Sequence, residues 1–193
     1  MTRRFAAISR ALHARLPLDR FRQDDKGIAM VEFAMVLPFL VALWLGLAML
    51  ADMENTSTRV SRVTATIGDI VAQSSEVTDD DLDKTFRAAE AFMGTEKASK
   101  LQMYVVGLKI DEDGKVTVAW SRGKNLTDVP LPQEDAPYTV PANLTVGAEN
   151  TFLVAAYGKF IHQPLYGSRF KTDYEYEYEN FFAPRLTDEI EKK

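Results

Sequence analysis

An uninterrupted apolar segment limits what this chain can fold into more than any other feature. Residues 33–51 read FAMVLPFLVALWLGLAMLA, 19 residues without a charged or strongly polar side chain. Because a helix rises about 1.5 Å per residue, this segment would extend about 28 Å, close to the thickness of the hydrocarbon core of a bilayer. A core helix in a small domain is normally amphipathic, whereas this one would be apolar on every face. The segment therefore predicts a single membrane-spanning helix.

The charges on either side of the segment predict its orientation. Residues 1–27 contain seven Lys/Arg and three Asp, a net charge of +4, whereas the other 166 residues contain 16 Lys/Arg and 25 Asp/Glu, a net charge of −9. Basic flanks stay on the cytoplasmic side of a membrane. We therefore expect a cytoplasmic N-terminus and an acidic body on the far side. A body with this charge also argues against a nucleic-acid-binding protein.

A cleaved secretory signal is the competing interpretation of the same segment. The apolar region of such a signal is usually about 7–15 residues long and ends at a cleavage site of small residues. The apolar run here is longer, and residues 51–55 (ADMEN) contain no clear cleavage site. The small residue in Leu47-Ala48-Met49 leaves this alternative open.

Glu32 directly precedes the apolar segment. Counted from Ile28 to Ala51, the hydrophobic stretch has 24 residues, with this carboxylate at the fifth position. An ionised carboxylate within a bilayer is costly, so carboxylates retained there usually have a function. The alternative is that Glu32 lies at the interface and reaches the lipid headgroups, which requires no further role.

The chain lacks the residue patterns of common catalytic and metal sites. It has no cysteine, which excludes disulfides, thiolate zinc sites, iron–sulfur clusters and cysteine nucleophiles. It has no P-loop and no G-x-S-x-G motif, and its two histidines, His13 and His162, are not spaced for zinc. The acidic runs at 79–81 and 111–113 lack the spacing of a calcium loop. We therefore expect no enzymatic activity, no cofactor and no metal.

The start of the hydrophobic stretch contains a recognisable motif. Gly27 is followed by four residues and then by Glu32-Phe33, with a basic segment before it and an apolar run containing Pro38 after it. This arrangement resembles the processing site of type IV prepilins and is most similar to the TadE/TadF-like pseudopilins of the tight-adherence (Tad/Flp) pilus system. The resemblance covers residues 22–51 and the sequence FFAPRL at 181–186, whereas the middle of the chain is similar only in general composition.

The resemblance implies a function and a domain organisation. A prepilin peptidase in the membrane would cut between Gly27 and Ile28. The chain would then comprise a basic cytoplasmic leader (1–27), a transmembrane helix (28–51) and a periplasmic pilin-like domain (52–193). The mature protein would be a minor pilin-like subunit in the bacterial inner membrane. Its partners would be membrane lipid, the peptidase, other pilins or pseudopilins and the pilus assembly platform.

The resemblance also implies roles for residues at the start of the helix. Glu32 would pair with the new amino group on Ile28 of a neighbouring subunit, which would offset the desolvation of both charges in lipid. Phe33 belongs to the same assembly motif. Glycine at position 27 would let the backbone approach the peptidase closely. Pro38 would remove one helical hydrogen bond and bend or locally unwind the helix.

Two helices are predicted in the body of the chain. The first, residues 52–75, continues the membrane-spanning helix. Thr78 followed by three aspartates predicts the start of the second, and Gly94 predicts its end. Apolar residues recur at helical spacing in both: Val60, Val63, Ile67, Ile70 and Val71 in the first, and Leu82, Phe86, Ala89 and Met93 in the second.

Four strands are predicted to follow. The first two are separated by an Asp-Gly turn at 113–114, which is typical of a β-hairpin. A proline-rich stretch at 123–142 predicts a long loop within the domain. The fold class is therefore α+β, with a long N-terminal helix and a small domain in which an antiparallel sheet packs with one or two helices. The strands are expected at 101–110, 115–122, 150–160 and 169–182.

The last predicted strand alternates tyrosine with glutamate. Tyr174, Tyr176 and Tyr178 would lie on one face of the sheet and the acids on the other. An aromatic face of this kind usually covers a helix inside a domain, but it can also bind a glycan or a peptide. The alternative function is therefore an extracytoplasmic binding module held at the membrane by an uncleaved signal-anchor.

Overall fold

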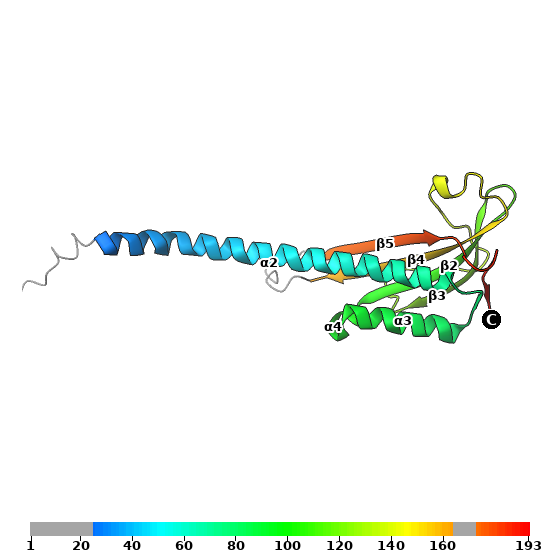
Figure 1. The fold of residues 1–193 in the computed structure, drawn as a ribbon, viewed down its shortest axis with the longest axis horizontal. Coiled ribbons are helices and arrows are strands. Elements are labelled where there is room, and N and C mark those ends of the chain that lie inside the picture. Colours follow the sequence, from blue (N-terminus) through cyan, green and yellow to red (C-terminus); the bar gives the residue numbers. More distant parts are fainter. Residues whose placement is uncertain (1–24, 164–172) are drawn as a thin grey trace, which may run out of the picture. The chain divides into compact units, whose positions relative to one another are not determined.

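A computed structural model describes residues 25–163 and 173–193 of the chain (Figure 1). The chain divides into two compact units, residues 1–48 and 49–193. Helix α2 (Asp25–Ala72) belongs to both units and has 48 residues. The predicted basic leader lies outside the described residues except for its last three.

The body of the chain contains a four-stranded antiparallel sheet in the order β3-β2-β4-β5. All four predicted strands are confirmed, and β3 and β4 each extend two residues beyond the predicted end. The predicted residues 169–172 of the last strand lie outside the described part of the chain. The strands are β2 (Leu101–Ile110), β3 (Val116–Lys124), β4 (Thr151–His162) and β5 (Tyr174–Phe182).

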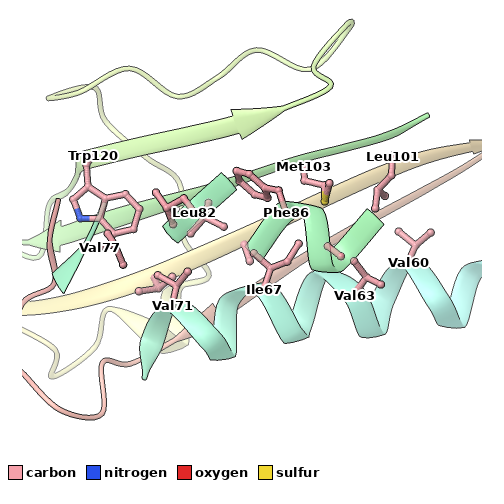
Figure 2. Packing of buried hydrophobic residues seen from close by; sticks show 14 of the residues in the cluster. Val60, Val63, Ile67, Val71, Val77, Leu82, Phe86, Leu101, Met103 and Trp120 are labelled. Atoms are coloured by element: carbon pink, nitrogen blue, oxygen red, sulfur yellow. The ribbon is translucent and has the colours of Figure 1, made fainter. Parts of the chain in front are cut away.

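One face of the sheet is covered by α3 (Asp79–Met93) and by the part of α2 that follows Val60. Figure 2 shows side chains of α2 directed toward those of α3 and the sheet. The predicted apolar face of α3 is buried completely, whereas Ile70 of α2 is 43% exposed. Ile70 lies at the edge of the apolar stripe that Ile67 and its neighbours form, so the prediction was wrong for this residue. Helix α2 ends at Ala72, before the predicted Ser75.

The start of α3 uses the acidic run that follows Thr78. The backbone N–H of Asp81 donates to Thr78 Oγ1 (3.2 Å), and the backbone N–H of Thr78 donates to Asp81 Oδ2 (3.3 Å). This reciprocal capping satisfies N–H groups that the helix itself leaves free, and the hydrogen bond from the threonine lowers the pKa of Asp81. The aspartates therefore stabilise a helix terminus. A short helix, α4 (Thr95–Ala98), follows.

The opposite face of the sheet is covered by the long loop between β3 and β4. This loop includes the 3₁₀ helix η1 (Ala142–Leu144), and it packs on a second apolar cluster. Because both faces are covered, every residue of β2 except Lys109 is buried. The loop was predicted, but its packing as a second layer was not. Its partly buried apolar residues are Leu126, Val129, Leu131, Tyr138, Val140 and Ala148.

The C-terminal segment returns to the core. Strand β1 (Glu76–Val77) pairs in parallel with β6 (Glu191–Lys192), and Ile190 is fully buried. The indole N–H of Trp120 donates to the backbone carbonyl of Ile190 (2.7 Å). Neither this pairing nor the return of the chain was predicted.

Two glycines lie at contacts between helix α2 and the sheet that leave no room for a side chain. A Cβ added at Gly158 of β4 would overlap Thr64 Oγ1 of the helix, and a Cβ added at Gly68 would overlap the ring of Phe182. Glycine at both positions therefore sets the distance between this part of α2 and the sheet.

Candidate functional site

None of the described residues of its own unit covers the N-terminal part of α2. No side chain from Ile28 to Ala48 is buried, and most of the large apolar ones are about half exposed or more. Over the residues that the structure describes, α2 is the one helix long and apolar enough to cross a membrane. Exposed apolar surface of this extent marks contact with lipid or with another protein.

Glu32 lies on this exposed part of α2, and Phe33 beside it is 61% exposed. Ile28 precedes the glutamate by four residues, so the two side chains share a face of the helix. Among the side chains that the structure describes, none forms an ion pair with Glu32. The carboxylate lies at an exposed position of the helix.

Pro38 lies inside α2, and the helix continues on both sides of it. Because proline has no N–H, the carbonyl of Ala34, four residues earlier, has no helical donor. In a bilayer this carbonyl needs a donor from a neighbouring side chain or helix.

Gly27 and Ile28 lie within helix α2, close to its first described residue, Asp25.

The tyrosine face of β5 is directed toward the core. Tyr176 and Tyr178 pack against the apolar cluster that the helices share with the sheet. The Tyr178 hydroxyl also forms a 2.6 Å hydrogen bond with Ser57 Oγ of α2. The interpretation as an inner face is therefore confirmed for these two residues, and their rings do not form an open binding surface.

The acidic face of β5 surrounds a lysine that the sequence analysis did not single out. Lys159 of β4, whose side chain is 10% exposed, lies 2.9 Å from Asp128, 3.3 Å from Glu175 and 3.0 Å from Glu177. Its hydrogen bond to Asp128 is the main cause of the raised pKa of Lys159, and the same contact lowers the pKa of Asp128. In the sequence, Lys159 stands out as the one lysine of a largely apolar strand. Its pairing with glutamates of β5 depends on the register of β4 and β5, which the sequence does not show directly.

His162, at the end of β4, is buried close to Asp52 of α2. Its Nε2 lies 3.3 Å from Asp52 Oδ2 without the geometry of a hydrogen bond, while Lys97 of α4 lies 3.6 Å from the same carboxylate group. The ring of Tyr176 lies beside the imidazole at 6.2 Å. Burial lowers the pKa of His162; the lysine acts in the same direction and the aspartate against it. His162 is thus a buried residue at the contact between β4 and α2.

We expect the protein to lose stability as the pH falls below about 6.5, the pKa of an unfolded histidine. Because the folded state holds the pKa of His162 below that value, the unfolded chain binds more protons in this range. The free energy of unfolding therefore decreases as the pH decreases. Thermal unfolding measured from about pH 8 to about pH 5 gives the slope of protein stability against pH. His162→Gln should reduce the slope, and an unchanged slope would contradict this assignment.

Among the described residues, no group of three or more His, Asp or Glu side chains is placed to hold a metal ion. Comparisons of the chain with protein-family models, with curated proteins and with solved structures gave no match. The function therefore has to be inferred from the residues and their arrangement.

Proposed function

We propose that this chain is a minor pilin-like assembly protein, a pseudopilin of a Tad/Flp-type pilus. One observation supports this most strongly: α2 is apolar and exposed from residue 28 to residue 51, and it is buried against an antiparallel sheet from residue 60 onward. A long hydrophobic N-terminal helix that packs on an antiparallel sheet is a pilin-like topology.

In this proposal α2 anchors the protein in the bacterial inner membrane. The basic residues before the helix stay in the cytoplasm, and the sheet domain lies in the periplasm. A prepilin peptidase removes the leader at Gly27–Ile28, which creates an ammonium group on Ile28. Glu32 pairs with such an ammonium group on a neighbouring subunit, so that each charge offsets the desolvation of the other.

The protein acts in this proposal through contacts and not through catalysis. Its partners are membrane lipid, the prepilin peptidase, other pilin-like subunits and the assembly platform, and no nucleic acid is involved. The packing of Tyr176 and Tyr178 against the core favours this function over a binding module that presents an aromatic face.

The sequence of the mature N-terminus tests the proposal. Protein purified from its native host should begin at Ile28, and the precursor should be larger by about 3 kDa, since 27 residues are removed at an ordinary mean residue mass. Gly27→Leu should leave the precursor uncut, because the added side chain keeps the backbone from the peptidase. Immunoblotting distinguishes the two forms.

Gly46→Leu is the matched control, because it makes the same change farther along α2, where an added Cβ meets no atom within 4 Å. This variant should be processed normally. An N-terminus at residue 1 or 2 would contradict the proposal, and one after residue 51 would identify a cleaved secretory signal instead.

A further inference from the structure

The unit formed by residues 49–193 has a groove on its helix layer. Side chains of α2 and α3 line a cavity of about 430 Å³. Arg59 and Arg62 are exposed, and neither forms an ion pair with a described side chain. Phe92 is 66% exposed, which is unusual for a large aromatic residue. The lining residues, here called the arginine groove, are Arg59, Arg62, Val63, Thr66 and Phe92.

The other side of the same unit carries the opposite charge. Glu175, Glu177 and Glu179 alternate along β5 with tyrosines that pack under the helix layer, so these glutamates lie on the far face of the sheet. The side chains of Glu175 and Glu177 are 55% and 48% exposed. Lys159 pairs with both of these glutamates and with Asp128, and the hydroxyl of Tyr138 in the covering loop donates to Glu179, so one positive charge is shared among four carboxylates and the face remains negative. The three glutamates are called the acidic face.

We propose that the arginine groove binds the acidic face of a second copy of this chain. The two surfaces have opposite charge and lie on opposite sides of one unit, so each copy can offer its acidic face to one neighbour and its groove to another. Arginine binds carboxylates through paired hydrogen bonds, and charge complementarity sets the orientation of such contacts.

A contact between two different surfaces does not close on itself in a pair of copies. It continues from copy to copy and produces a row, unless the rotation between neighbours closes a ring. The inference goes beyond the proposed function, because this contact needs neither the cut at Gly27 nor the charge of Glu32. Failure of the proposed contact can therefore be distinguished from failure of the proposed function.

Cross-linking tests the contact in the full chain in its membrane, because the chain has no cysteine of its own. Phe92→Cys and Glu175→Cys in one chain, treated with a bismaleimide, should give a ladder of dimers, trimers and larger species. Either substitution alone should give monomers, and a mixture of the two single variants should give dimers only. The control variant combines Phe92→Cys with Glu112→Cys, which lies at the exposed turn between β2 and β3. This pair should give no ladder.

Charge reversal tests why the two surfaces bind. In the chain with both cysteines, Arg62→Glu should lower the yield of the ladder about tenfold or more, because like charges then face each other. Lys115→Glu makes the same reversal of charge at an exposed lysine outside the groove and should leave the yield of the ladder unchanged. Equal melting temperatures of the two variants exclude a difference in folding.

Three results would overturn the proposal: dimers from Phe92→Cys alone, which indicate a symmetric contact; no ladder from the double variant; or a ladder that Arg62→Glu does not weaken.

Discussion

Glu32→Gln is expected to abolish assembly while the chain remains in the membrane. Glutamine keeps the size of the side chain but removes the charge, so under the proposed pairing the ammonium of the neighbouring subunit is left without a partner in lipid. Breaking a buried ion pair by removing one partner costs about 3–5 kcal/mol, and about 3 kcal/mol already lowers an association constant more than a hundredfold. The measurement is the amount of this chain that co-purifies with pilin-like partners, relative to the amount in the membrane.

Glu54→Gln is the matched control, because it makes the same substitution on the same helix just beyond the apolar segment and at an exposed position. It should not affect assembly. Normal assembly by the single Glu32→Gln variant would contradict the pairing.

Phe86→Ala is expected to lower the free energy of unfolding of the sheet domain by about 3–5 kcal/mol. Phe86 is fully buried in the cluster between the helices and the sheet, so removal of the ring leaves a cavity that its neighbours cannot fill (Figure 2). Small domains are stable by only about 5–15 kcal/mol, so this loss is a large part of the total. Chemical denaturation of the full chain in detergent, followed by near-ultraviolet circular dichroism, measures it.

Phe92→Ala on the same helix is the control for this substitution. Its ring is mostly exposed, so the free energy of unfolding should change by about 0.5 kcal/mol or less. The two phenylalanines thus separate the core from the arginine groove: Phe86→Ala should strongly destabilise the domain, and Phe92→Ala should leave its stability almost unchanged. Equal destabilisation by both would contradict the observed packing of α3.

The parts of the fold that the sequence predicted correctly depend on neighbouring residues. Helix α3 was predicted in full because its cap, its acidic first turn and its apolar face lie within 17 residues, from Thr78 to Gly94. The β2–β3 hairpin was predicted for the same reason, since an Asp-Gly turn joins two strands that are adjacent in the sequence. The apolar part of α2 needed only its composition and length.

The features that were missed depend on contacts between distant residues. The two-residue strands β1 and β6 have no pattern of their own, and they pair only because the chain returns to the core. The packing of the loop on the second face of the sheet was not predicted, because its apolar residues follow neither the period of a helix nor that of a strand. Lys159 and His162 acquire their surroundings from strand register and from the position of α2, neither of which a local pattern contains.

The candidate site divides in the same way. Gly27, Ile28, Glu32, Phe33 and Pro38 were named from a linear motif, and the structure places the last three on an exposed apolar stretch of helix. The arginine groove has no linear motif, since its residues come from two helices.

The burial of Ile190 against Trp120 has a consequence for biogenesis. Without residue 190 the core lacks one of its fully buried side chains and Trp120 lacks its hydrogen-bond acceptor. If the domain crosses a membrane unfolded, as the proposed function requires, this part of the core forms only after residue 190 has been translocated. A product truncated before this point would leave Trp120 and Val77 accessible, and local opening of this kind is what a quality-control protease recognises. The returning segment thereby couples survival of the domain to synthesis of the chain as far as Ile190.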